Sequence, residues 1–253
     1  MRPLPACRRI VTQAFLIAAT LGCVMAPASA SGELLVMTEE VYPQSYLRNG
    51  EVVGTSTALV EQVLAEAGVA YRLDMRAWAA VMQTAEARTP MLLYPLARTA
   101  EREAGFIWIG QLDTLEHRIY KLARRGDLQP RSLDELHGHM IGVVKRDARE
   151  TFLLQNGFRP DAELLSIASG AQGLRLMLAG RLDYLPISPD GLAAACREEN
   201  LDCSQFEFVM PLGLKLRLYL AASLATPPAT VDRIRIAWSR IFDRSATQRL
   251  VRP

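Results

Sequence analysis

Short apolar runs of strand type alternate with segments of helical spacing over most of residues 31–253. The expected strands cover residues 34–38, 71–74, 91–96, 106–109, 141–144, 163–167, 182–187, 206–210 and 214–222. The expected helices cover residues 76–87, 131–137, 148–156, 170–179, 190–199 and 231–242, with one more between Thr55 or Ser56 and Gly68. Such alternation is typical of α/β layers with parallel strand pairing. Because the pattern restarts after residues 117–122, we expect two α/β lobes.

The segment from Met91 to Arg102 contains the strongest candidate for a ligand-binding side chain. Residues 91–96 form an apolar run of buried-strand type, and Thr99 then occupies a helix N-cap position. Ligands of open α/β sheets bind beyond the carboxyl ends of strands, and helix N-termini attract anions. The planar guanidinium of Arg102 suits a carboxylate there. The alternative is a surface arginine paired with a neighbouring glutamate.

The first thirty residues have the three parts of a secretory signal peptide. Three arginines precede an apolar run over residues 10–25, and a small-residue A-x-A site ends at Ala30. We therefore expect a signal peptide of residues 1–30, cleavage after Ala30 and an exported, soluble product. Lipidation at Cys23 is the alternative.

The charge of the remaining chain is nearly balanced. Residues 1–30 contain three of the 29 basic residues and none of the 27 acidic ones, so 26 basic and 27 acidic residues remain. A nearly neutral chain argues against a nucleic-acid or membrane-surface function that rests on bulk electrostatics.

Two of the four cysteines, Cys196 and Cys203, lie outside residues 1–30. In an exported chain, an even pair is most simply a local disulfide. A free thiol or a metal pair is the alternative, but no histidine or third cysteine lies near them in sequence, and we expect no metal site.

Five short motifs occur in an order that is found in one known family. They are YP at 42–43, NGEVVG at 49–54, TAER at 99–102, LDELHG at 133–138 and AGRLD at 179–183. In these motifs the chain resembles the type II periplasmic solute-binding proteins of the polar-amino-acid type (extracellular solute-binding family 3). The resemblance covers nearly all of the chain beyond the signal peptide.

The resemblance implies an α/β fold of two lobes, each a mostly parallel sheet flanked by helices, joined by two crossing strands. Residues 117–122 and 214–222 would be the crossing strands. Lobe one would comprise residues 31–118 and 217–253, and lobe two residues 119–216.

The resemblance also implies a ligand site in the cleft between the lobes. Arg102 matches the family's arginine that binds the ligand carboxylate, and Tyr42 matches an aromatic residue near the ligand. The other candidate ligand-binding residues are Trp78, Ala97, Val144, Asp147, Arg149, Ser188 and Asp190. Helical spacing alone indicates that Trp78 is a core residue, and we expect His117, in a crossing strand, to make a local hydrogen bond.

Departures from the family pattern change the expected ligand. Tyr94, Pro95 and Ala97 replace hydroxyl residues before Arg102, and Ser188 stands where the family has an acid for the ligand's amino group. Arg98 and Arg149 add cations to the cleft rim. These departures favour a small carboxylated solute, either an amino acid or an organic acid.

The resemblance implies a monomeric periplasmic protein that captures its solute by hinge closure and delivers it to an ABC-type permease of the inner membrane. We expect no catalytic residue and no cofactor. One alternative is a ligand-sensing subunit without a transporter. Another is a periplasmic lyase similar to cyclohexadienyl dehydratase, which needs a cleft carboxylate as general acid or base; Asp147, Glu150 and Asp190 are candidates.

Overall fold

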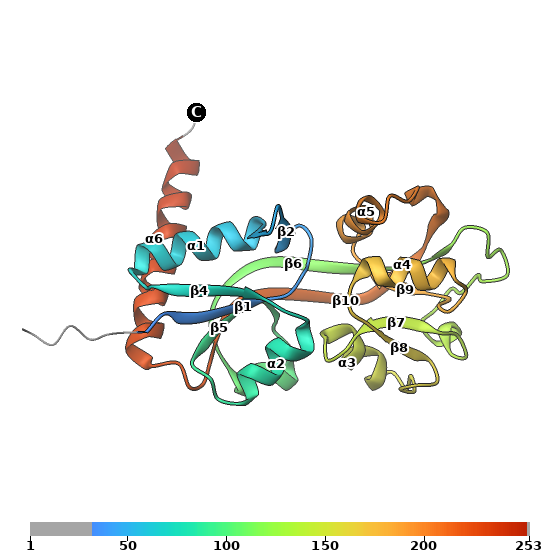
Figure 1. Ribbon diagram of the computed structural model, residues 1–253, viewed down its shortest axis with the longest axis horizontal. Coiled ribbons are helices and arrows are strands. Elements are labelled where there is room, and N and C mark those ends of the chain that lie inside the picture. Colours follow the sequence, from blue (N-terminus) through green and yellow to red (C-terminus); the bar gives the residue numbers. More distant parts are fainter. Residues whose placement is uncertain (1–31, 252–253) are drawn as a thin grey trace, which may run out of the picture. The chain divides into compact units, whose positions relative to one another are not determined.

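A computed structural model of the protein describes residues 32–251. The expected signal peptide and Cys23 lie outside these residues. The elements in chain order are β1 (Leu34–Thr38), β2 (Tyr46–Arg48), β3 (Glu51–Val53), α1 (Thr55–Ala67), β4 (Tyr71–Met75), α2 (Trp78–Glu86), β5 (Met91–Ala97), η1 (Ala100–Gly105), β6 (Phe106–Leu122), η2 (Asp134–Leu136), β7 (Ile141–Val144), α3 (Ala148–Gln155), β8 (Leu164–Ile167), α4 (Gly170–Leu178), β9 (Leu185–Ile187), α5 (Pro189–Glu198), η3 (Cys203–Gln205), β10 (Phe206–Ser223) and α6 (Pro228–Val251) (Figure 1).

The main sheet has six strands in the order β4-β1-β5-β10-β6-β9. β1 pairs in parallel with both β4 and β5, and β7 pairs in parallel with β8. α1, α2 and α6 surround the β1, β4 and β5 end, which we name lobe one, while α3, α4 and α5 accompany β7, β8 and β9 in lobe two (Figure 1). The predicted two-lobe α/β fold is thereby confirmed, whereas the residue boundaries of the lobes stay a prediction.

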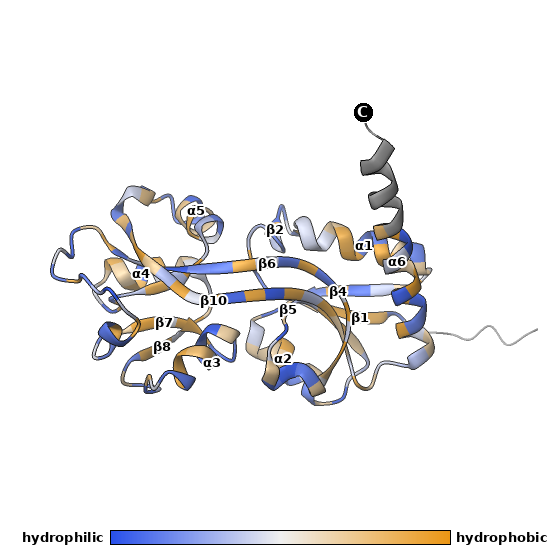
Figure 2. Cartoon of the chain, turned by 180° about the vertical axis from the view of Figure 1, so that it is seen from behind, coloured by the Kyte–Doolittle hydropathy of each residue, from blue (hydrophilic) through white to orange (hydrophobic). Residues whose placement is uncertain are grey.

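Two long strands run from one lobe into the other. β6 has 17 residues and β10 has 18, and they pair antiparallel along their length with several register shifts. The sequence predicts two short strands in place of each of them, because polar residues interrupt the apolar runs. Antiparallel pairing satisfies the backbone of both strands even where their side chains face solvent. Figure 2 shows the resulting alternation of apolar and polar residues along β10.

The core of lobe one surrounds β5, all seven residues of which are buried, as the apolar run predicts. Val60, Val63 and Leu64 of α1 pack in one cluster with Val231 and Ile234 of α6. These residues recur at intervals of three and four, so each helix presents one apolar stripe to the sheet.

The start of α1 differs from the prediction, while its end agrees. Gly54, rather than Thr55 or Ser56, is the N-cap residue, with φ of 138°. A Cβ at Gly54 would lie 2.3 Å from the carbonyl oxygen of Gln44, so the close backbone approach requires glycine here. At the other end, Gly68 closes the helix in the left-handed conformation.

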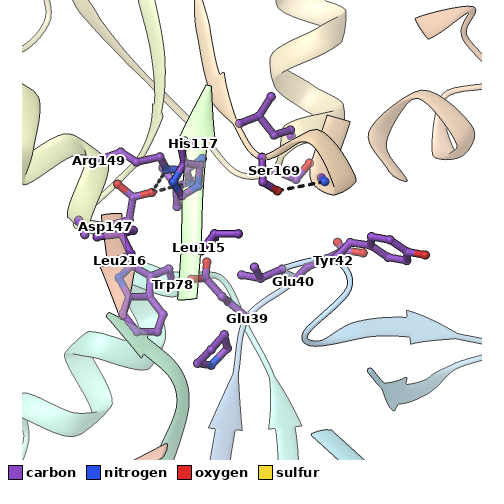
Figure 3. Close-up of a pocket in the computed structure, with 18 of the residues that line it drawn as sticks. Glu39, Glu40, Tyr42, Trp78, Leu115, His117, Asp147, Arg149, Ser169 and Leu216 are labelled. Atoms are coloured by element: carbon purple, nitrogen blue, oxygen red, sulfur yellow. Dashed lines mark hydrogen bonds and ion pairs between the residues drawn. The ribbon is translucent and has the colours of Figure 1, made fainter. Parts of the chain in front are cut away.

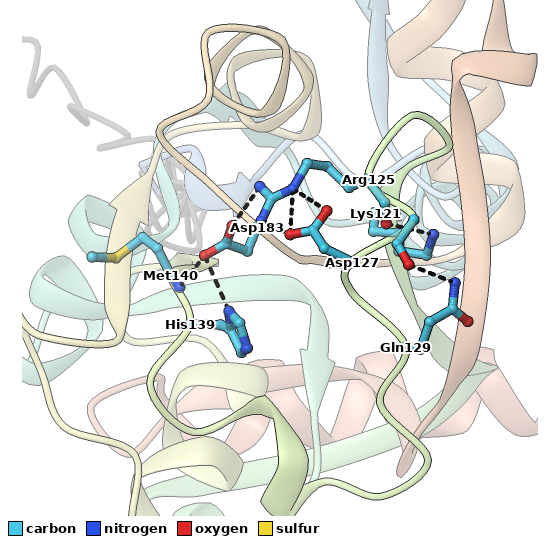
Figure 4. A network of polar contacts seen from close by, with 8 residues as sticks. Lys121, Arg125, Asp127, Gln129, His139, Met140 and Asp183 are labelled. Carbon is cyan, nitrogen blue, oxygen red and sulfur yellow. Dashed lines mark hydrogen bonds and ion pairs between the residues drawn. The ribbon is translucent and has the colours of Figure 1, made fainter.

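A charged network lies in lobe two at the end of β6 (Figure 4). Arg125 forms ion pairs with Asp127 at 2.7 Å and with Asp183 at 2.9 Å. Asp183 also accepts a hydrogen bond from the backbone N–H of Met140 and lies 3.6 Å from Nδ1 of His139. The network joins the segment after β6 to the segments before β7 and β9.

Only η2 forms in the region where a helix is expected at residues 131–137.

Among the helices described between residues 32 and 251, none combines the length and the apolar character needed to cross a membrane.

Candidate functional site

A cavity of about 130 Å³, which we name the cleft, is lined by residues of both lobes (Figure 3). Its walls follow the carboxyl ends of five strands: Glu39 follows β1, Ala97 ends β5, Val144 ends β7, Ala168 follows β8 and Ser188 follows β9. This is the usual ligand position in open α/β sheets. One water molecule needs about 10–15 Å³ of cavity volume, so the cleft has room for a small-molecule ligand.

Arg102 lies in η1, on the lobe-one wall of the cleft. The α-helix expected after Thr99 is absent, because residues 100–105 form a 3₁₀ helix that leads directly into β6. Thr99 occupies the N-cap position but makes no side-chain cap hydrogen bond. The candidate arginine is therefore next to the end of β5, as predicted, but not at the N-terminus of an α-helix.

The guanidinium of Arg102 is oriented by backbone carbonyl groups. Nη1 donates to the carbonyl of Ala97 at 3.2 Å, and Nη2 donates to the carbonyl of Arg146 at 2.9 Å. The guanidinium also lies 5.5 Å from the centroid of the Trp78 ring, within cation–π range. Burial lowers the pKa of Arg102, while the carboxylate of Asp147 acts in the opposite direction. Arginine stays protonated at neutral pH in such surroundings.

Asp147 and Arg149 form an ion pair on the lobe-two wall. Asp147 Oδ1 caps α3 by accepting from the backbone N–H of Glu150 at 2.9 Å, and Oδ2 accepts from Arg149 Nε at 2.5 Å. Arg149 Nη1 donates to the carbonyl of Pro186 at 2.9 Å. Since Asp147 and Arg149 neutralise each other, neither presents an uncompensated charge to the cleft.

Three helices of lobe two begin at the cleft wall. Asp147 is the N-cap of α3, Ser169 of α4 and Ser188 of α5, and each side chain accepts a hydrogen bond from a backbone N–H of its own helix. All three N-cap residues line the cleft. The positive ends of the helix dipoles therefore favour a negative ligand group on this side.

Three acids of the cleft were not found in the sequence analysis: Glu39, Glu40 and Glu198. Burial raises the pKa of Glu39 to about 8, and the carboxylate of Asp147 adds to the shift. Burial also raises the pKa of Glu40, with Glu198 as the second cause. Glu39 directly follows the buried strand β1. A position just after a buried strand indicates a possible ligand-binding residue, as it does for Arg102 after β5, and this signal could have identified Glu39.

His117 is also in the cleft wall, in β6, with 7% of its surface exposed. The expected local hydrogen bond is wrong for Nδ1, which has no hydrogen-bond partner among the described residues. Burial holds the pKa of His117 well below its usual value, and the nearby charge of Arg149 contributes, so the imidazole is neutral.

Eight of the nine predicted ligand-binding residues line the cleft together: Tyr42, Trp78, Ala97, Arg102, Val144, Asp147, Arg149 and Ser188. Asp190, near the start of α5, is not among the lining residues. Trp78 lines the cleft and is also 97% buried. It can therefore pack in the core, as its helical spacing indicates, and still contact a ligand. Whether these residues bind a ligand stays a prediction.

The predicted disulfide between Cys196 and Cys203 is confirmed, with Cα atoms 5.6 Å apart. It joins α5 to η3 beside the cleft wall. Within residues 32–251, no group of three or more histidine, cysteine or acidic side chains is arranged to bind a metal ion.

The fold and the cleft define a class, the two-lobe fold of the type II periplasmic binding proteins. No protein-family model and no curated protein matches the sequence. Solved structures do share the fold. A histidine kinase sensor domain with similarity to periplasmic binding proteins has a TM-score of 0.73 and 16% identity, over 85% of this chain and 92% of that one.

Two further structures extend the comparison to bound solutes. The arginine-, lysine-, histidine-binding protein ArtJ of Geobacillus stearothermophilus has a TM-score of 0.70 and 14% identity, over 85% of this chain and 91% of its own. The GluR0 ligand-binding core of Nostoc punctiforme, in complex with L-glutamate, has a TM-score of 0.68 and 17% identity, over 86% of this chain and 96% of its own. The chain therefore shares its fold with proteins that bind amino acids.

Proposed function

We propose that this protein is a periplasmic solute-binding protein that binds a small carboxylated solute, an amino acid or an organic acid, in the cleft. The observation that carries the proposal is that Arg102 and Trp78 of lobe one line the same cavity as Arg149 and Ser188 of lobe two. A ligand in this cavity contacts both lobes, so binding stabilises the closed arrangement.

Arg102 is the proposed binding residue for the carboxylate. A guanidinium has five N–H donors, and the described contacts of Arg102 with Ala97 and Arg146 use one on each terminal nitrogen. These contacts fix the plane of the guanidinium and leave other donors for a ligand. The N-termini of α3, α4 and α5 add a favourable field for a negative group.

In this proposal each lobe moves as one unit. Lobe one comprises residues 31–118 and 217–253, and lobe two comprises residues 119–216. β6 and β10 are the connection about which they close. A signal peptide of residues 1–30 directs the chain to the periplasm, where it acts as a monomer. An ABC-type permease is the proposed partner, and the likeness to a sensor domain keeps a ligand-sensing role as the alternative.

A thermal-shift screen of the purified mature chain against amino acids, dicarboxylates and small organic acids tests this function. A ligand that binds the folded state raises Tm. For a solute found in this way, we expect Arg102→Ala to weaken binding about 100-fold, because a charged hydrogen-bonded pair is lost. The matched control is Arg98→Ala, since Arg98 pairs with Glu103 and does not line the cleft. Equal binding by wild type and Arg102→Ala would refute the assignment.

A lyase is the second candidate, because Glu39 has the pKa of a group that is protonated at neutral pH and lines the cleft. Such a carboxylic acid can act as a general acid. The earlier candidates are less suitable: Asp147 is paired with Arg149, and Glu150 accepts a hydrogen bond from the backbone N–H of Arg146. Incubation with prephenate tests the lyase, and formation of an aromatic product that Glu39→Gln abolishes would replace the binding proposal.

A further inference from the structure

Of the residues of β6 and β10 that the structure describes in the cleft wall, one is polar. Leu115 of β6 and two residues of β10, Leu216 and Leu218, line the cleft with apolar side chains. Successive side chains of a strand point to opposite faces, so His117 lies on the same face of β6 as Leu115, and the exposed Glu116 lies on the other. The two strands thus place a single imidazole on an otherwise apolar face of the cleft.

The pairing of the two strands is irregular at His117. The residues before and after it pair with Lys215 and Pro211 of β10, so residues 212–214 form a bulge opposite His117 alone. Gly213, in the middle of this bulge, has φ of 82°, a conformation that glycine adopts without strain. Bulges change the direction of side chains and are frequent next to functional sites. The regular ladder is therefore interrupted where the polar side chain meets the cleft.

Nδ1 of His117 has no hydrogen-bonding partner among residues 32–251, and 7% of the residue's surface is exposed. A buried polar atom without a partner costs the free energy of its lost hydration, so native proteins rarely contain one. Because His117 is part of the cleft wall, a group that enters the cleft can supply the partner. The ring therefore indicates a polar group on the ligand.

The surroundings of the ring indicate which kind of group this is. Burial and the charge of Arg149, which lies beside the ring in Figure 3, hold the pKa of His117 well below its usual value, so the imidazole is neutral at pH 7. Arg149 is itself paired with Asp147. Neither an ammonium nor a carboxylate group of a solute therefore finds an uncompensated opposite charge at the ring, and an uncharged group fits best.

A hydroxyl group fits this position better than an amide. One hydroxyl oxygen both donates and accepts, so it can pair with a neutral imidazole in either tautomer. An amide has a carbonyl oxygen and a separate NH₂ group, and the apolar side chains of Leu115, Leu216 and Leu218 offer no partner to the second of them.

Resting on the proposed function, we propose that the solute carries a hydroxyl group, which hydrogen-bonds the imidazole of His117 while the carboxylate binds Arg102. The solute meets the ring in the open cleft, and closure then encloses the hydrogen bond. A solute without the hydroxyl leaves a polar nitrogen buried without a partner, so the site discriminates against it. The ligand is therefore a hydroxylated acid, and His117 is a specificity-determining residue.

Pairs of solutes in which a methyl group replaces the hydroxyl test the proposal. They are L-malate with methylsuccinate, L-lactate with isobutyrate, and L-homoserine with L-norvaline. In at least one pair, thermal shift and calorimetry on the mature chain should show the hydroxylated member binding about ten- to a hundredfold more tightly than its methyl partner, because a hydrogen bond to a buried group is lost.

His117→Phe keeps an aromatic ring and removes both nitrogens. It should weaken binding of the hydroxylated member about ten- to a hundredfold and leave the methyl partner nearly unchanged, whereas a purely structural role would weaken both equally. His117→Asn and His117→Gln each keep a polar atom near one ring nitrogen, and at least one of them should retain the preference. His139→Phe is the matched control, because His139 contacts Asp183 and does not line the cleft.

A spectroscopic test on the wild-type chain stays decisive even if His117→Phe does not fold. The sequence contains three histidines, so ¹⁵N labelling of the imidazoles gives few signals. Single substitutions of His137 and His139 identify the signals of those residues by their loss. The hydroxylated member should shift a ring nitrogen signal of His117 more than its methyl partner does, and equal shifts would contradict a hydrogen bond to the hydroxyl.

The outcomes separate this inference from the function on which it rests. Equal affinities within every pair overturn the hydroxyl group and leave solute binding intact. A preference for the hydroxylated member that His117→Phe leaves unchanged overturns the assignment to His117. The absence of binding by every solute in the wider screen overturns both proposals.

Discussion

Arg102 of lobe one donates a hydrogen bond of 2.9 Å to the backbone carbonyl of Arg146 in lobe two. The same carbonyl accepts from Trp78 Nε1 at 3.0 Å, and the Arg146 guanidinium forms an ion pair with Glu86 of α2. Contacts between the lobes on this side of the cleft thus need no ligand. Arg102 contributes to lobe association as well as to the proposed binding of a carboxylate.

Trp78→Phe should shift the ligand-free protein toward an open arrangement. The substitution removes the indole N–H that donates a hydrogen bond to the carbonyl of Arg146, but it keeps an aromatic face beside Arg102. Loss of one hydrogen bond weakens the closed state by about 1 kcal/mol, about a fivefold change in the equilibrium. Small-angle X-ray scattering should show a larger radius of gyration. Trp108→Phe, which removes an indole hydrogen bond to Glu103 within lobe one, should leave the radius unchanged.

Gly110→Ala should destabilise the protein by about 1–3 kcal/mol. A Cβ at Gly110 in β6 would lie 1.9 Å from the ring of Trp238 in α6, so the helix or the strand must move. Urea denaturation measures the change in the free energy of unfolding. Gly105→Ala, where a Cβ meets no atom within 4 Å, is the control, and an equal loss at both sites would contradict the packing argument.

The disulfide should contribute about 2 kcal/mol, since Cys196 and Cys203 are seven residues apart and close a short loop. In a chain of this size, reduction should lower Tm by about 4–8 °C. The double substitution Cys196→Ser with Cys203→Ser should lower Tm by a similar amount and remove the effect of a reductant. A reductant that still lowers Tm in the double variant would show that the effect has another source.

Glu163 makes the stability of lobe two dependent on acid pH. Hydrogen bonds from the backbone N–H of Gly138 and from Arg159 lower the pKa of Glu163 to about 2. Because the folded state favours the charged form, this stabilisation is complete above the ordinary value of 4.5 and is lost as the pH falls toward 2.

Urea denaturation of wild type and Glu163→Gln between pH 7 and pH 2.5 tests this dependence. The difference in the free energy of unfolding should be largest at neutral pH and shrink in acid, as the wild-type carboxylate becomes protonated. The exposed Glu51→Gln should show no such trend. If the difference in the free energy of unfolding between wild type and Glu163→Gln did not depend on pH, the shape of the Glu163 side chain rather than its charge would be the cause.

Features that are written in local sequence were predicted well. The apolar run of β5, the glycine that ends α1 and the paired cysteines each depend on residues close together in the chain. The residues that line the cleft could be approached only through strand ends and family motifs. The end of β5 indicates Arg102 in this way, and the end of β1 equally indicates Glu39, which follows it directly.

Features that depend on distant partners were predicted poorly. β6 and β10 continue through polar residues because each is the other's hydrogen-bonding partner, which no window of either sequence reveals. Thr99 is a residue type that often caps α-helices. Because β6 begins at Phe106, only a 3₁₀ helix forms in residues 100–105 between Thr99 and that strand. That His117 Nδ1 has no hydrogen-bond partner within residues 32–251 depends on how tertiary packing surrounds the ring.

The strand order has a consequence for how the chain reaches this state. β10 lies between β5 and β6, so a strand near the carboxyl end separates two strands that are consecutive in the chain. Until residues 206–223 have been synthesised, β5 and β6 have no common neighbour, and one edge of β5 is unpaired. Such long-range pairing slows folding. Chains that end before residue 206 should be susceptible to proteases and to chaperone binding, and native resistance should require residues 206–223.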